Sequence, residues 1–103
     1  MKQPNCCLTL ITPTIFEEEL VDRFKQRSDV ASGLTITRVE GYSQERGPRD
    51  DAEIVHGRGP RVRVQALMDR DDATTLLRQL RADLHSPDIA YWVTPVLEFG
   101  RLA

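Results

Sequence analysis

The stretch RVRVQALM, residues 61–68, decides the fold of this chain because apolar and polar residues alternate along it. The apolar residues are Val62, Val64, Ala66 and Met68, and the polar ones are Arg61, Arg63 and Gln65. Successive side chains of a β-strand point to opposite faces of a sheet. The pattern therefore predicts a strand with one face on a hydrophobic core.

A helix is expected directly after this strand. Asp69, with Asp72 three residues further on, is typical of a helix N-cap. Leucines then recur at helical spacing over residues 70–84, at Leu76, Leu77, Leu80 and Leu84. The predicted helix ends at His85-Ser86-Pro87, because the residue before a proline disfavours helical backbone.

The N-terminal half predicts the same order of elements. Residues 6–12, CCLTLIT, are β-branched or apolar and end at Pro13, which predicts a strand. Thr14 and Glu17 have the spacing of a capping box for a helix over residues 15–26. The apolar face of that helix consists of Phe16, Leu20, Val21 and Phe24.

Residues 34–42, LTITRVEGY, predict a second strand. Leu34 and Ile36 share one face, and Thr35, Thr37 and Val39 share the other. The shift of apolar residues from even to odd positions suggests a bulge or a change of face.

Two further segments complete the chain. Residues 43–60 carry glycines, prolines and charges of both signs, and so long a segment without regular structure is expected in a compact domain only where it is functional or mobile. Residues 89–99, IAYWVTPVLEF, predict a final strand, or two short ones meeting at Pro95. Proline removes a hydrogen-bond donor from the sheet, so this strand is expected at an edge or a bend.

The order of these elements predicts one α+β domain over residues 1–103 with the ferredoxin-like βαββαβ fold. Its antiparallel four-stranded sheet has two helices on one face, and a long loop joins strands two and three. The other face would be bare, with Tyr91 or Trp92 among its occupants, and Trp92 is expected in the core or a subunit interface. Apolar residues on both faces predict an oligomer.

Composition excludes several classes of protein. Hydrophobic residues make up 40% of the chain and charged residues 29%, which suits a globular domain. A net charge of −2 argues against a general nucleic-acid binder. No apolar run approaches the ~20 residues of a membrane-spanning helix, and no cleavage site follows the N-terminal apolar stretch, so a cytoplasmic protein is expected.

The stretch GLTITRVEGYSQERG, residues 33–47, resembles the segment that leads into the T-loop of the PII signalling proteins. Residues 59–64, GPRVRV, resemble the segment that re-enters the sheet in that family, and the order of elements agrees over nearly the whole chain. The CutA trimers of copper tolerance share this fold. The resemblance implies a homotrimer that binds adenine nucleotides between subunits. It also implies that a T-loop-like segment, residues 43–60, binds and regulates a partner transporter or enzyme.

The site residues implied by this resemblance lie mostly at the start of that segment. The implied adenine pocket consists of Thr35, Gly41 and Tyr42, and the residues facing the phosphates are Ser43, Gln44 and Glu45. The glycine-rich B-loop of the family is missing between His85 and Val93, which removes much of the cradle for a triphosphate. The effector therefore stays open between a small anion and an adenine nucleotide. Arg61 and Arg63 either meet that anion in an intersubunit cleft or form ion pairs.

A metal-binding or metal-responsive protein of a heavy-metal tolerance or efflux system is the alternative. Its ligands would come from Cys6, Cys7, His56 and His85. A disulfide between adjacent cysteines on a strand would be strained, so one buried and one half-exposed thiol are expected otherwise. The chain has no nucleophile elbow, Walker loop or zinc-spaced ligand pair, so no enzymatic activity is expected.

Overall fold

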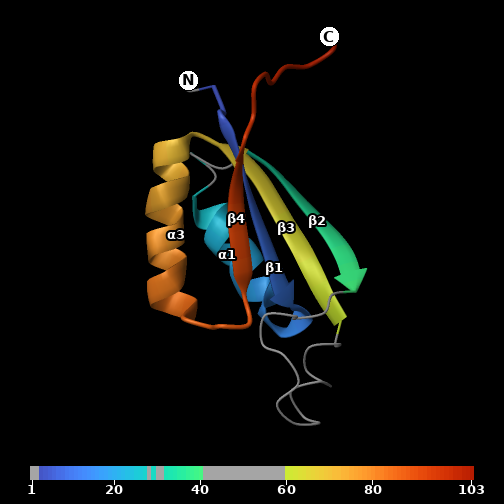
Figure 1. Cartoon of the computed structure of the whole chain (residues 1–103), viewed down its shortest axis with the longest axis vertical. Coiled ribbons are helices and arrows are strands. Elements are labelled where there is room, and N and C mark those ends of the chain that lie inside the picture. The colour runs from blue at the N-terminus through green and yellow to red at the C-terminus, as the bar shows by residue number, and fades with distance from the viewer. Residues whose placement is uncertain (1–2, 28, 30–31, 41–59) are drawn as a thin grey trace.

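A computed structural model of the chain describes residues 3–27, 29, 32–40 and 60–103. The elements are β1 (Cys6–Pro13), a 3-10 turn (Thr14–Phe16), α1 (Glu17–Gln26), β2 (Ser32–Glu40), β3 (Pro60–Met68), α3 (Arg70–Leu84) and β4 (Ala90–Pro95). The strands form one antiparallel sheet in the order β2-β3-β1-β4. In the view of Figure 1, α1 lies behind the strands and α3 lies to the left of β4, and both helices contribute to one core with β1 and β3. The predicted ferredoxin-like βαββαβ fold is confirmed.

The core lies between the helices and one face of the two central strands. Every second residue of β1 and β3 points into it, and the two strands pair in register there, as Leu8 does with Ala66 and Leu10 with Val64. The helices contribute Leu20, Phe24, Ala73, Leu76 and Leu80. The alternation of RVRVQALM therefore predicted the core face of β3 correctly, because a central strand is buried on that face along its whole length.

The two helices begin in different ways. At α3, a carboxylate oxygen of Asp69 accepts a hydrogen bond from the backbone N–H of Asp71 at 3.0 Å, which confirms Asp69 as the N-cap. The capping box expected at Thr14 and Glu17 is wrong. Thr14–Phe16 form a 3-10 turn whose N-cap is Pro13, α1 begins only at Glu17, and neither start has a side-chain cap.

The second strand runs over Ser32–Glu40 and begins two residues earlier than expected, whereas residues 41 and 42 lie outside the described residues. Thr35 and Thr37 pair with Gln65 and Arg63, so the predicted division of its two faces is confirmed. The irregularity of register lies between Ser32 and Thr35, at Gly33 with φ +67°, and not where the apolar positions shift. The apolar positions shift because the face of Ile36 carries a charged residue, Arg38, two positions later. Arg38 forms an ion pair with Glu17 of α1 at 3.4 Å.

The last strand is an edge strand, as Pro95 predicted, since β4 pairs with β1 alone. Residues 96–103 continue without forming a second strand, and this tail leaves the sheet at the end opposite the 3-10 turn (Figure 1). The tail exposes Leu97, Phe99 and Leu102. Within the described ranges, neither helix is long and apolar enough to cross a membrane.

Candidate functional site

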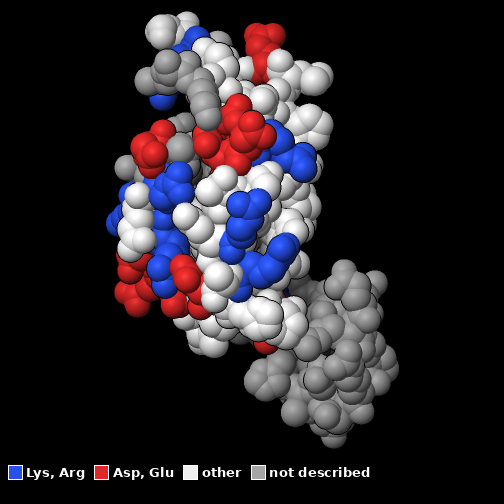
Figure 2. Space-filling view, turned by 90° about the vertical axis from the view of Figure 1, so that its left-hand side faces the viewer, with Lys and Arg blue, Asp and Glu red and all other residues white. Residues whose placement is uncertain are grey.

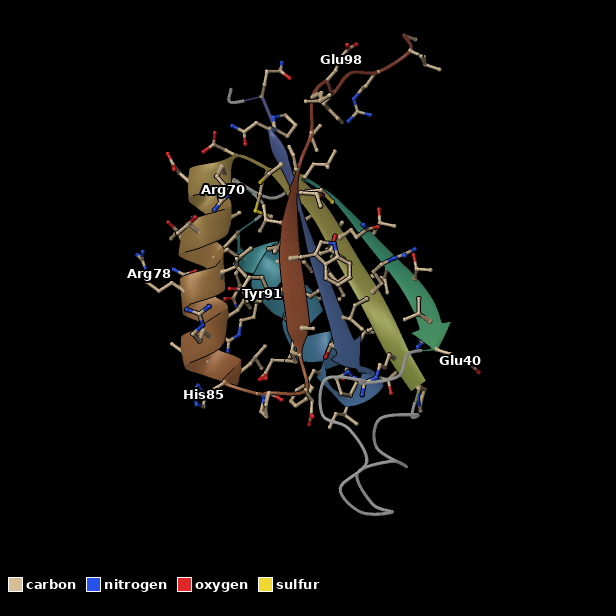
Figure 3. All side chains as sticks on the ribbon, viewed as in Figure 1. Glu40, Arg70, Arg78, His85, Tyr91 and Glu98 are labelled. Atoms are coloured by element: carbon tan, nitrogen blue, oxygen red, sulfur yellow. The ribbon has the colours of Figure 1, made fainter. Side chains whose placement is uncertain are left out.

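The sheet face that the helices leave uncovered carries side chains from all four strands. We call it the open face, and Figure 3 looks onto it. Its residues are Cys7, Thr9 and Ile11 of β1, Thr35, Thr37 and Val39 of β2, Arg61, Arg63, Gln65 and Leu67 of β3, and Ala90, Trp92 and Thr94 of β4. Trp92 is 46% exposed. A sheet face that mixes an exposed indole with half-buried aliphatic residues is typical of a surface that another protein covers.

A row of polar side chains crosses the middle of the open face. Thr35, Gln65, Thr9 and Trp92 are opposite one another on neighbouring strands. The Nε2 atom of Gln65 donates a hydrogen bond to Oγ1 of Thr9 at 3.2 Å, and Thr9 is only 1% exposed. The two central residues of the row, Gln65 and Thr9, therefore hold each other in place within one subunit.

Two arginines lie at the end of the open face where residues 41–59 leave and re-enter the sheet. Arg61, 8% exposed, pairs with Pro13 and Val39 across the sheet, and its Nη1 donates to the backbone oxygen of Asp88 at 3.4 Å. Arg63 lies between Thr37 and Ile11, and its Nε is buried with no hydrogen-bond partner among the residues that the structure describes. A buried cationic donor of this kind favours a nearby anion, because leaving it unpaired is costly.

The structure brings Thr35 onto the same face as these arginines. Thr35 and Arg63 lie on adjacent strands, two residues apart in register, which corresponds to about 7 Å along the strand. The other residues of the expected nucleotide site, Gly41, Tyr42, Ser43, Gln44 and Glu45, lie outside the described residues. No glycine occurs between α3 and β4, and the backbone N–H groups of Asp88 and Ile89 donate to Ser86 at 3.2 and 3.3 Å. This connection offers few free amides to a polyphosphate, which agrees with the missing B-loop.

The expected metal ligands do not come together in the described part of the chain. Cys6 is buried on the helix side, its thiol donates to the backbone oxygen of Met68 at 3.3 Å, and burial raises the pKa of this thiol. Cys7 lies on the open face, whereas His85 caps the far end of α3, a helix about 22 Å long. No group of three metal-ligating side chains forms among these residues, and His56 lies outside them.

Sequence reasoning missed one feature, a cavity of about 410 Å³ between α3 and β4. Leu77, Leu80 and Leu84 line it together with Leu10, Leu20 and Ile89. Tyr91, expected as an occupant of the bare face, lies on the helix side, where its hydroxyl accepts a hydrogen bond from Arg81 at 2.9 Å (Figure 3). The only feature of the sequence that relates to this cavity is the row of leucines on α3. Such a row predicts an apolar helix face, but it does not show whether other side chains fill the space against that face.

Comparisons with known proteins agree with this geometry. The sequence model of a family of proteins of unknown function, DUF3240, matches residues 2–103. A DUF3240 family protein from Shewanella baltica has a TM-score of 0.77 at 19% identity, over 99% of this chain and 100% of that one. The search of the curated proteins gives no match.

Two PII-like proteins have the same fold. CPII, a nitrogen regulatory PII-like protein from Thiomonas intermedia bound to ADP, AMP and bicarbonate, has a TM-score of 0.71 at 19% identity, over 96% of each chain. A putative PII-like signalling protein from Thermus thermophilus has a TM-score of 0.65 at 24% identity, over 90% of this chain and 87% of that one. The resemblance to PII proteins is thus confirmed at the level of the fold. The chain belongs to the DUF3240 family, and its architecture is that of the PII-like signalling proteins.

Proposed function

We propose that this chain is a non-enzymatic PII-like regulator, a homotrimer that binds a small anion or an adenine nucleotide and regulates a transporter or enzyme through residues 43–60. The observation that carries the proposal is the position of Arg63. Its buried Nε has no partner in the described part of the chain, on a face that leads directly to both ends of the 41–59 segment. An anion bound there would lie where the segment begins and ends.

The chemistry of the site favours an effector with few phosphates. The structure of CPII has ADP, AMP and bicarbonate bound; ADP has two phosphates, AMP has one and bicarbonate has none. In this chain, the connection after α3 uses its own amides within a tight turn. Arg63 can still hold an oxyanion with its guanidinium group, because a guanidinium binds a carboxylate or phosphate in a bidentate way. We therefore expect bicarbonate, AMP or ADP to bind more tightly than ATP.

The trimer is proposed because the open face exposes apolar side chains that association with other subunits would bury. The helices bury only one face of the sheet, and Trp92, Ile11, Leu67 and Val39 stay partly exposed on the other. Association of three such faces would bury these side chains. It would also bring the arginines of one subunit close to the other subunits.

Titration calorimetry with bicarbonate, AMP, ADP and ATP tests the effector site. Arg63→Gln is expected to weaken binding of the preferred anion at least tenfold, because a charge-assisted hydrogen bond to a partly buried anion is lost. Arg78→Gln is the matched control, since Arg78 is exposed on α3. Equal affinity of both variants and the unmodified protein for every anion would refute the site.

Deletion of residues 43–60 tests the regulatory segment. Val39 and Arg61 are opposite each other on paired strands, so residues 40–42, which remain between them, can form a short turn without disturbing the sheet. The deletion variant is expected to remain a trimer by light scattering and to lose a specific protein that co-purifies with the full chain from its native cells. If that protein co-purifies equally with both, another surface makes the contact.

A further inference from the structure

We propose that the cavity between α3 and β4 is a second ligand site, which binds a small amphipathic carboxylate with its apolar chain inside and its carboxylate at Arg81. This site goes beyond the proposed function, because it lies on the helix side of the sheet, away from the open face and Arg63. All of its lining residues come from one chain, so each subunit would hold one such site without a contribution from another subunit.

The interior of the cavity suits an apolar chain. Its floor consists of Leu10 and Leu20, both buried in the core, and its walls are Leu77, Leu84 and Ile89. A volume of about 410 Å³ lies within the ~300–1,000 Å³ of small-molecule pockets, and these are also mostly apolar with a few placed polar groups. The cavity is open to solvent on one side, so a ligand that fills it would remove its apolar lining from water and gain contacts with it.

The polar groups of the cavity all lie at its mouth, and they favour an anion. Arg81, His85, Ser86 and Tyr91 line the cavity, and no carboxylate does so in the described part of the chain. Arg81 donates from Nη2 to the hydroxyl of Tyr91, an arrangement that holds the guanidinium beside the opening. A guanidinium has five N–H donors, so several remain for a ligand.

The neighbouring charges support this assignment. Asp83, the nearest acidic residue of α3 in sequence, already pairs with Arg23 of α1 at 3.2 Å. No ion pair links Arg81 to any residue within the described ranges. Figure 2 shows this side of the molecule, with basic side chains amid uncharged ones over its middle and acidic side chains above and to the left of them. A carboxylate head group therefore meets a cation that no internal carboxylate neutralises.

The competing occupant is the tail of a second copy of the chain, since residues 96–103 expose Leu97, Phe99 and Leu102. Within one subunit the tail runs from the far end of β4, away from His85 at the other end of α3 (Figures 1 and 3). The tail also carries an acidic residue, Glu98, which could approach Arg81 of another copy. Glu98 lies between the bulky residues Leu97 and Phe99, however, so its carboxylate is not at the end of a slender chain. A free carboxylate with a slender chain fits the combination of an apolar lining and a basic residue at the cavity better.

A homologous series of straight-chain carboxylates, from butyrate to decanoate, tests the proposal by titration calorimetry on the full chain. Burial of each methylene is expected to tighten binding about fourfold until the cavity is full. The alcohol of the best length should bind about tenfold more weakly than the carboxylate, because it lacks the charge-assisted hydrogen bond. Amide shifts in NMR spectra should cluster at Leu77, Leu84 and Tyr91 and leave Gln65 of the open face unchanged.

Two variants separate the interior from the mouth. Arg81→Gln should abolish the preference for carboxylate over alcohol, whereas Arg78→Gln, three residues earlier on α3, should keep it. Leu77→Phe should shorten the chain length at which affinity stops rising. Arg63→Gln should leave the series unaffected, so failure of this site and failure of the proposed anion site are distinguishable.

Three outcomes would overturn the proposal. The first is an affinity that does not depend on chain length, and the second is an equal effect of Arg81→Gln and Arg78→Gln. The third is that the full chain binds no carboxylate of the series and that changing Leu97 and Phe99 both to Ser abolishes its self-association. That result would show that the tail of another copy fills the cavity.

Discussion

Replacement of Trp92 by alanine is expected to dissociate the proposed trimer. The 46% of its side chain that is exposed corresponds to about 115 Å² of a total of about 250 Å². At about 25 cal/mol per Å², burial of this area contributes about 3 kcal/mol per subunit, and therefore about 9 kcal/mol for three subunits if the interface covers each indole completely. Because trimer formation depends on the square of the free subunit concentration, the midpoint of dissociation should rise about a thousandfold.

Tyr91→Ala provides a matched control for this experiment. Tyr91 is the preceding residue of β4 and is 45% exposed, but its side chain lies on the helix side of the sheet. Sedimentation velocity over a wide range of concentrations measures both midpoints, and far-UV circular dichroism checks that both variants fold. If Tyr91→Ala dissociates the assembly and Trp92→Ala does not, the open face is not the interface. A monomer at every concentration of the unmodified protein would refute the trimer itself.

Further predictions concern the core, the start of α3 and the two thiols. Leu8→Ala should lower the free energy of unfolding in urea by about 2–5 kcal/mol, because Leu8 of the central strand β1 is 0% exposed in the core; a loss below about 1 kcal/mol would contradict this. Asp69→Ala should cost about 1 kcal/mol in the same assay, since the N-cap is lost while Asn5 still accepts from the first amide of α3 at 2.8 Å. In the Trp92→Ala variant, whose open face is expected to be free of other subunits, iodoacetamide at about pH 8 should modify half-buried Cys7 and spare Cys6, with mass spectrometry as the readout. Burial raises the pKa of Cys6 in the folded state, so as pH rises this thiol ionises in the unfolded chain before it does so in the folded one. The free energy of unfolding should therefore fall as pH rises through the ordinary pKa of a thiol, and Cys6→Ala should remove this effect.

The elements of the fold could be predicted where one physical signal dominated. The alternation in β3 identified its core face, and Asp69 identified the start of α3, because each follows from local geometry. The capping box failed because Thr14 lies directly after Pro13, and the chain forms a tighter 3-10 turn there before α1 begins. Local spacing alone does not show which of two competing turns the chain adopts.

The candidate site was harder to predict than the fold. In IAYWVTP apolar residues occupy both faces, so the faces of Tyr91 and Trp92 depend on the register with β1, and a shift by one residue exchanges them. The cavity depends on how far α3 stands from the edge strand, which no pattern within α3 records. Arg63 was identified as a candidate from its place on the polar face, but the burial of its Nε follows only from the strands on both sides of it.

The pairing of Glu40 with Pro60 has a consequence for how this family can change over evolution. It holds the two ends of the 41–59 segment one strand spacing apart, whatever the sequence between them. The entropic cost of closing a connection grows only with the logarithm of its length, so a doubling costs about 0.6 kcal/mol. Insertions, deletions and complete replacement of this segment are therefore nearly neutral for the stability of the sheet. The sheet and its helices can therefore stay the same while this one stretch of chain changes.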